Sequence, residues 1–251
     1  MISLRVAFIL FLAMLVGCTS THEVKEPSRK RENIRLYLGA DVGGPESSWS
    51  ILKEYQISEL KIRLSELHFF DACAKGRNLL IEIDGPINSD TSLFIERIFE
   101  TYGPCVDAKG KNSYPLVFLN SNGGSLIDGY KIGRVFRHYG IAAYVHKGQV
   151  CASACAVAFL GAKARGVWEG GTLIFHAPYK VGRGGFIIDC SDMDVANSLK
   201  SYYREMLTST NVEHIFNRTM SYCSNRDGWT LNKAAADLIG LTNLPAIYKN
   251  L

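Results

Sequence analysis

The segment Gly148-Gln-Val-Cys-Ala-Ser153-Ala-Cys-Ala-Val-Ala-Phe-Leu-Gly161, followed by Thr172-Leu-Ile-Phe-His176-Ala-Pro178, decides the fold and the chemistry expected of this chain. The pattern predicts an extended segment that turns at Ser153 into a short apolar helix, and a strand that ends at His176. A serine hydroxyl becomes a good nucleophile only when an adjacent base accepts its proton, and histidine commonly fills that role. We therefore predict that Ser153 and His176 meet in a catalytic site.

A second motif lies upstream, where Tyr114-Pro-Leu-Val-Phe-Leu-Asn120 runs into Ser-Asn-Gly123-Gly124-Ser125. The pattern predicts a strand, a tight diglycine turn and a helix. Glycine lets a backbone N–H approach a substrate without a Cβ in the way, and a helix start presents unpaired N–H groups. We predict an oxyanion hole made by the N–H groups of Gly124 and Ala154.

Each motif also has an ordinary structural interpretation. A lone serine in a small-residue helix usually packs, and a lone histidine after an apolar strand is usually a core residue with its hydrogen bonds satisfied. Because the motifs occur together and in order, we favour the catalytic interpretation for Ser153 and His176.

These motifs resemble those of the Clp protease proteolytic subunit and the wider Clp/crotonase superfamily, over about residues 79 to 245. Asn120-Ser-Asn-Gly-Gly124 resembles the family's Asn-Ser-Pro-Gly-Gly, with Asn122 in place of proline. Gly148–Ala156 resembles the nucleophile turn, Phe175-His-Ala-Pro178 resembles Ile-His-Gln-Pro, and Ala234–Leu241 resembles the closing helix turn. Secreted Clp-like proteins with a Cys-x-Ser-Ala-Cys turn are the most similar. The resemblance implies an α/β fold, a ββα spiral with mainly parallel sheets and a handle-like helix.

The same resemblance places the acidic member of a Ser-His-Asp triad at Asp227, in Asn225-Arg-Asp-Gly-Trp229. An Asp before Gly is also a common turn former. Asp189, Asp192 and Asp194 are rivals, because they too follow His176 along the chain.

The function implied is that of a serine hydrolase, by analogy a peptidase acting on peptides or unfolded proteins, with no cofactor. An exported enzyme has no access to ATP, so no ATPase partner is expected. The first alternative is a non-catalytic Clp-like protein that binds peptides or acts as a scaffold of the cell envelope. A crotonase-type acyl-CoA enzyme comes third, because coenzyme A is not expected outside the cytoplasm.

The N-terminus predicts export. A basic start precedes the eleven apolar residues Val6 to Val16, too few for a membrane span, and Leu15-Val-Gly-Cys18 resembles a bacterial lipobox. We expect a signal peptide at 1–17, lipidation of Cys18 with a flexible tether at 18–45, and the hydrolase domain at 46–251. Thr19 favours the outer membrane, with the domain facing the periplasm. An ordinary secretory signal with an incidental cysteine is the alternative.

The charge composition argues against a nucleic-acid-binding protein. The formal net charge is only +4, which gives no electrostatic reason to expect nucleic acid as a partner.

Apart from Cys18 the chain has six cysteines, and an even number in an exported protein favours disulfides. We prefer the pairs Cys73–Cys105 and Cys190–Cys223. Cys151 and Cys155 bracket Ser153, so either a bond between them shapes the turn or one of them is the nucleophile. The sequence contains no Cys-x-x-Cys pair, so it gives no reason to expect a metal site.

The segment from Asp194 to Thr210 has the apolar spacing of an amphipathic helix, with Ser191 or Asp192 near its start. In the Clp family this region is the handle through which rings assemble. The sequence leaves open whether the helix forms a homo-oligomer or packs on its own domain.

Replacing Cys18 by serine tests the anchor. We expect Cys18→Ser to move the protein from the membrane fraction to the soluble fraction, because two or more acyl chains are needed for durable attachment. Fractionation and intact mass measure this, with Ser20→Ala as the control. A mutant that stays membrane-bound, together with a wild type that carries no acyl mass, would contradict lipidation.

Overall fold

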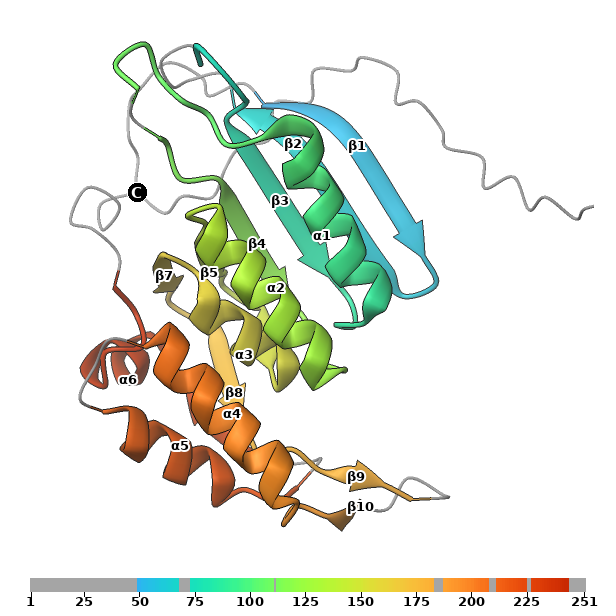
Figure 1. Cartoon of the computed structure of the whole chain (residues 1–251), viewed down its shortest axis with the longest axis vertical. Helices are drawn as coiled ribbons and strands as arrows, with labels where there is room; N and C mark the ends of the chain where they lie inside the picture. The colour runs from blue at the N-terminus through green and yellow to red at the C-terminus, as the bar shows by residue number, and fades with distance from the viewer. Residues whose placement is uncertain are drawn as a thin grey trace, which may run out of the picture.

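The computed structural model describes residues 49–67, 73–110, 112–182, 187–207, 211–224 and 227–243. Its main feature is a six-stranded sheet of order β1-β2-β3-β4-β5-β7 (Figure 1). The strands are β1 (Trp49–Ile57), β2 (Leu60–Leu67), β3 (Leu79–Asp84), β4 (Leu116–Asn120), β5 (Ala142–Val145) and β7 (Ala164–Val167). The β1 to β3 pairs are antiparallel, whereas β3, β4, β5 and β7 run parallel.

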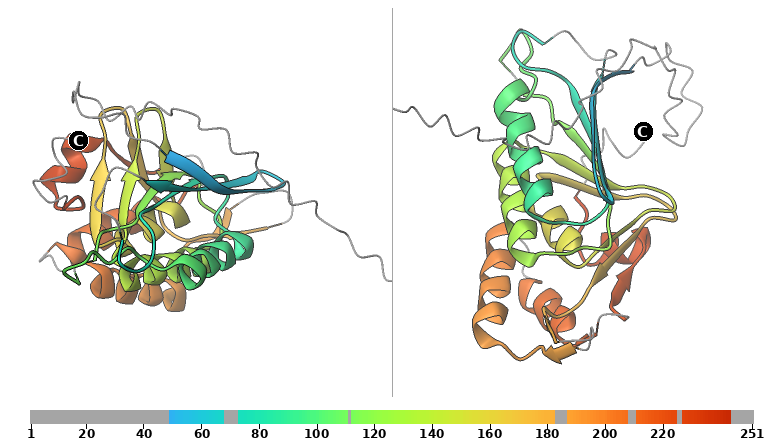
Figure 2. Two further views of the ribbon diagram at one scale, coloured as in Figure 1. Left: turned by 90° about the horizontal axis from the view of Figure 1, so that it is seen from above. Right: turned by 90° about the vertical axis from the view of Figure 1, so that its right-hand side faces the viewer.

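Three helices cover one face of this sheet (Figure 2). They are α1 (Ser89–Tyr102), α2 (Leu126–His138) and α3 (Ala154–Gly161). Asn88 caps α1 and Ser125 caps α2, each with a side-chain oxygen that accepts a backbone N–H. All eight residues of α3 are buried, as its uniformly apolar sequence requires.

A smaller sheet of order β11-β8-β6 lies at the carboxyl end of the parallel strands. Its strands are β6 (Val150–Ala152), β8 (Thr172–Phe175) and β11 (Trp229–Leu231). β6 is parallel to β8, and β11 is antiparallel to it. The Ser121 N–H donates to Val150 O at 2.7 Å and the Ala152 N–H donates to Ser121 O at 2.9 Å, so the end of β4 is joined to β6.

The C-terminal part forms the lower end of the molecule in Figure 1. It contains β9 (Lys180–Val181), β10 (Ile187–Asp189), α4 (Met193–Met206), α5 (Val212–Met220) and α6 (Lys233–Leu238). Asp192 caps α4, close to the expected start. The inner face of α4 packs on its own domain, with Tyr202 against Tyr130 and Tyr203 against Phe175. Self-association of this region stays a prediction.

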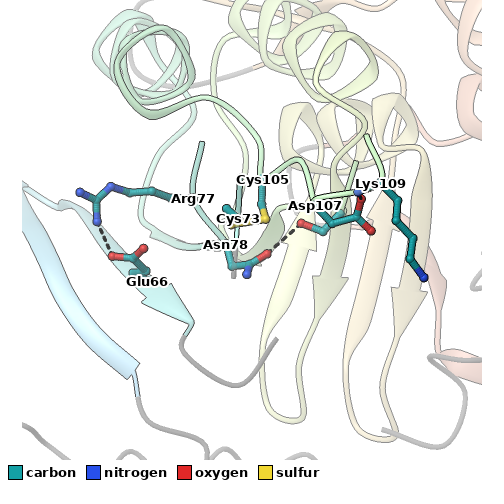
Figure 3. The surroundings of a disulfide bond; sticks show 8 residues. Glu66, Cys73, Arg77, Asn78, Cys105, Asp107 and Lys109 are labelled. Carbon is teal, nitrogen blue, oxygen red and sulfur yellow. Dashed lines mark hydrogen bonds and ion pairs between the residues drawn. A yellow bond between two sulfur atoms is a disulfide. The ribbon is translucent and has the colours of Figure 1, made fainter. Parts of the chain in front are cut away.

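Three disulfides join the six cysteines considered above. The preferred pairs Cys73–Cys105 and Cys190–Cys223 are present, with Cα separations of 5.3 and 5.8 Å. The former links the segment before β3 to the segment after α1, beside the Arg77–Glu66 ion pair (Figure 3). Cys151 is bonded to Cys155, so the bond that spans Ser153 is observed and neither sulfur is a free thiol.

Residues 1–48, which include the predicted signal peptide, Cys18 and the tether, lie outside the described residues. Within the part of the chain that is described, no helix has both the length and the apolar character needed to cross a membrane.

Two arginines hold the carboxyl end of α3. Arg165 is 5% exposed and donates to Leu241 O at 2.7 Å, Ala162 O at 2.8 Å and Leu160 O at 3.3 Å. Arg137 donates to Leu160 O and to Met206 O. Burial lowers the pKa of the Arg165 guanidinium to about 10, so it keeps its charge at neutral pH. These charges face the negative end of the α3 dipole.

We expect Arg165→Met to lower the free energy of unfolding by about 3 kcal/mol, because buried carbonyls lose charged donors. Denaturant unfolding measures the change. Arg97→Met, at an exposed position of α1, is the control and should change stability by less than about 0.5 kcal/mol. Equal effects of the two substitutions would contradict this role of Arg165.

Candidate active site

Ser153 occupies a strained turn between β6 and α3. Its φ is 56° and its ψ is −123°, a conformation that residues other than glycine rarely adopt. The Ser153 N–H donates to Ile174 O at 2.8 Å. A serine in the N-cap position usually caps the helix with its hydroxyl, but this one makes no such bond. The half-buried hydroxyl is therefore not used in capping.

The diglycine turn packs directly against Ser153. Gly123 has a φ of 99°, and a Cβ added to it would lie 2.6 Å from Ser153 Cβ and 3.1 Å from Ala154 N. The Gly123 N–H donates to Ser121 Oγ at 3.0 Å. Only glycine fits this position, both for its φ and for its closeness to Ser153.

The Gly124 N–H and the Ala154 N–H belong to adjacent chain segments beside Ser153. Ile87 N–H donates to Gly123 O and Ser125 N–H donates to Ile87 O, both at 2.8 Å. In such a parallel bridge the N–H of the middle residue, Gly124, points away from Ile87. The Ala154 N–H is the first of α3 and has no acceptor within the helix.

His176 follows the last residue of β8. Leu173 and Phe175 are buried, while Ile174 and His176 are partly exposed on the other face of the strand. His176 Nδ1 lies 2.9 Å from Ala177 O, and its ring stacks on Tyr179. When Nδ1 donates to this carbonyl in the neutral imidazole, Nε2 is left unprotonated, as a general base requires.

The smaller sheet brings the predicted residues to one end of its strands. Ala152 pairs with Ile174 and Trp229 pairs with Phe175. Ser153 and His176 thus each follow the end of one of two neighbouring parallel strands. Hydrogen-bonded strands lie about 4.8 Å apart. Continuing the β11 register sets Gly228 opposite His176, with Asp227 one residue further.

The side chains of Ser153, His176 and Asp227, all within the described ranges, are not hydrogen-bonded to one another. Asp227 is exposed, and its backbone N–H donates to Ser224 Oγ at 3.0 Å. Catalytic hydrogen bonds are often long before substrate binds and tighten in the complex. The roles predicted for the three residues therefore remain predictions.

Two of the rival aspartates have local partners. Asp189 accepts from the N–H and the hydroxyl of Ser191, and these bonds lower the pKa of its carboxyl. Asp192 caps α4 and pairs with Lys180 at 2.7 Å, which lowers the pKa of Asp192 and raises that of Lys180. Asp194 is exposed in the first turn of α4. The preference for Asp227 over these rivals stays a prediction.

Two groups that shape the candidate site, Ser121 and the carbonyl of Ala177, were not anticipated from the sequence. Ser121 joins β4 to β6 through its backbone and accepts from Gly123 through its hydroxyl. A serine two residues before a glycine is a recognisable signal for such a turn. The contact of Ala177 O with His176 has no sequence signal, because a carbonyl belongs to every residue type.

Among the residues that the structure describes, no three His, Cys, Asp or Glu side chains are grouped so as to hold a metal ion.

Comparison with known proteins identifies the fold. No protein-family model matches the chain, and no curated protein matches its sequence. A serine-to-alanine mutant of 1510-N, a membrane-bound stomatin-specific protease, aligns with 18% identity and a TM-score of 0.50 over 66% of this chain and 76% of that one. A lysine-to-alanine mutant of 1510-N with a substrate peptide gives the same identity and TM-score over 66% and 72%. ClpP1 from Listeria monocytogenes aligns with 20% identity and a TM-score of 0.48 over 66% and 89%.

At this level of identity the likeness concerns the fold alone. The chain has the mixed α/β, Clp/crotonase-like fold that the sequence predicted, with parallel strands at its centre.

Gly123→Ala tests the closeness of the diglycine turn to Ser153. The added Cβ would displace Ser153, so we expect at least a tenfold slower reaction of Ser153 with a fluorophosphonate, since about 1 Å of misplacement can cost a hundredfold. Gly148→Ala is the matched control, because Gly148 also has a positive φ but its Cβ would meet nothing within 4 Å. Equal labelling rates in the two variants would contradict the predicted contact.

Proposed function

We propose that this protein is a serine-type hydrolase, most simply a peptidase, that uses Ser153 as nucleophile and His176 as general base. The observation that carries the proposal is the turn at Ser153. It holds the serine in a strained conformation between the diglycine turn and the start of α3, at the end of the strand beside His176. Strained backbone of this kind is concentrated at functional sites.

The reaction begins when Ser153 Oγ attacks the carbonyl carbon of the scissile bond and its proton passes to His176 Nε2. The oxyanion that forms accepts from the N–H groups of Gly124 and Ala154, which stabilises the tetrahedral intermediate. The imidazolium then protonates the leaving amine, and an acyl-enzyme remains on Ser153. Water, deprotonated by His176, attacks the ester and releases Ser153.

In this proposal Asp227 assists His176 rather than acting on substrate. The β11 register, continued past Gly228, sets Asp227 on the side of β8 opposite β6, which supports a role for its carboxylate beside Nδ1. His176 Nδ1 lies within hydrogen-bond distance of Ala177 O, so in this proposal the carbonyl orients the ring and the carboxylate assists it. With two groups orienting the ring, the reaction rate depends less on Asp227 than it would in a triad whose carboxylate is the sole orienting group.

We infer that the substrates are peptides or unfolded chains met outside the cytoplasm. The related fold of 1510-N holds a substrate peptide in one of its structures. The three disulfides are typical of an oxidising compartment. Lipidation at Cys18 would tether the enzyme to the bacterial envelope, facing the periplasm, where it would act without an ATPase.

A peptide-binding protein without turnover is the second candidate. It is favoured by one observation, that His176 Nδ1 contacts a backbone carbonyl rather than Asp227. A site that keeps the diglycine turn but lacks an aligned base would bind an extended peptide without cleaving it.

Hydrolysis of a diverse peptide library by the purified protein distinguishes the two candidates. We expect cleavage by the wild type and a loss of at least about 10³-fold in kcat for Ser153→Ala and for His176→Ala, because each removes a reacting group. Ser198→Ala and His138→Ala, at exposed positions of α4 and α2, are the matched controls and should keep full activity. A wild type that binds peptides but yields no products would establish the binding protein instead.

For Asp227→Asn we expect a loss of kcat of about tenfold to a hundredfold. The loss should be smaller than the roughly 10⁴-fold seen where one carboxylate alone orients the base, because Ala177 O also contacts Nδ1. Steady-state kinetics with the best library substrate measure it, and Asp194→Asn is the control. An unchanged kcat would remove Asp227 from the mechanism.

A further inference from the structure

The Cys151–Cys155 disulfide spans the turn that carries Ser153. Cys151 lies in β6, Cys155 lies in the first turn of α3, and both are 0% exposed. Ser153 is half-buried between them. Ser153 is thus the partly exposed residue of a turn that a fully buried disulfide spans.

The strand end of this bridge is fixed on both edges. Cys151 pairs with Leu173 of β8 on one side and forms a bridge with Ser121 on the other. The hydrogen bonds of Val150 O and Ala152 N–H with Ser121 hold the residues before and after it. Cys151 is thus a rigid point to which the helix is tied.

The helix end of the bridge lacks the usual means of fixing a helix start. Ser153 makes no side-chain cap to α3, although serine is among the preferred capping residues. A residue in a sparsely populated region of φ and ψ keeps that conformation only when its surroundings impose it. A disulfide that ties the second residue of α3 to the strand across Ser153 is one means of imposing it.

Sequence separation favours a local role for this bond over a role in the stability of the whole domain. In the chain-entropy view, a disulfide stabilises a protein more when it closes a longer loop. The Cys151–Cys155 bond closes a separation of only 4 residues, whereas Cys73–Cys105 and Cys190–Cys223 close 32 and 33. The Cys151–Cys155 bond therefore stabilises the protein least through the entropy of the unfolded chain, yet it is the bond that spans the predicted nucleophile.

We propose that Cys151 and Cys155 are positioning residues whose disulfide holds Ser153 in its reactive conformation in place of a helix cap. This inference rests on the proposed hydrolase function and adds the element that aligns its nucleophile. The bond leaves Ser153 Oγ available to react and keeps the Ala154 N–H in a fixed place beside it.

The test compares two full-length double variants, Cys151→Ala/Cys155→Ala and Cys73→Ala/Cys105→Ala. For the first we expect kcat to fall about tenfold to a hundredfold, KM to change less than about twofold, and fluorophosphonate labelling of Ser153 to slow by the same factor as kcat. Its unfolding midpoint should fall less than that of the second variant. The second variant should keep the wild-type kcat, because its bond lies away from the site and closes a longer loop.

A first variant with wild-type kcat and labelling would overturn the positioning role while leaving the hydrolase proposal intact. A wild type that neither cleaves peptides nor labels at Ser153 would overturn both. If the double alanine variant does not fold, Cys151→Ala/Cys155→Val, which restores buried volume, takes its place under the same expectations.

Discussion

The rest of the structure depends on the backbone hydrogen bonds that hold β6 between the end of β4 and β8. Ser121 exchanges bonds with Val150 and Ala152 on one edge of β6, and Ser153 donates to Ile174 on the other. This short strand therefore links the large sheet to the small one. Because the diglycine turn follows β4 and Ser153 follows β6, the same bonds also set the distance between the two halves of the proposed oxyanion hole.

Close backbone packing of α2 on α3 preserves that arrangement further along the helices. A Cβ on Gly129 would lie 2.6 Å from Ala154 O, and a Cβ on Gly161 would collide with the backbone of Gly133. Both helices begin at the site, α2 after the diglycine turn and α3 after Ser153. Small residues along their contact let the two helix starts approach without side chains between them.

The sequence predicted the turns and helix starts around the candidate site because their signals are local. The diglycine turn and the apolar helix after Ser153 can each be read within a short stretch of residues, whereas the pairs Cys73–Cys105 and Cys190–Cys223 join segments 32 and 33 residues apart. The β1–β2 hairpin that extends the sheet was not anticipated, and neither was the contact of His176 with Ala177 O. Whether Asp227 faces His176 depends on strand register and on side-chain angles, which a single sequence does not determine.

The capping of α3 shows how stability and reactivity compete for one hydroxyl. An N-cap serine normally stabilises its helix by about 1 kcal/mol through the oxygen that a nucleophile needs. At positive φ Ser153 gives up that bond, and the conformation itself costs roughly 1–3 kcal/mol. Both costs are local, so they are best offset by groups that contact α3 without using the hydroxyl. The disulfide does this at the start of the helix, and Arg137 and Arg165 do it at the end, where their charges meet the unpaired carbonyls.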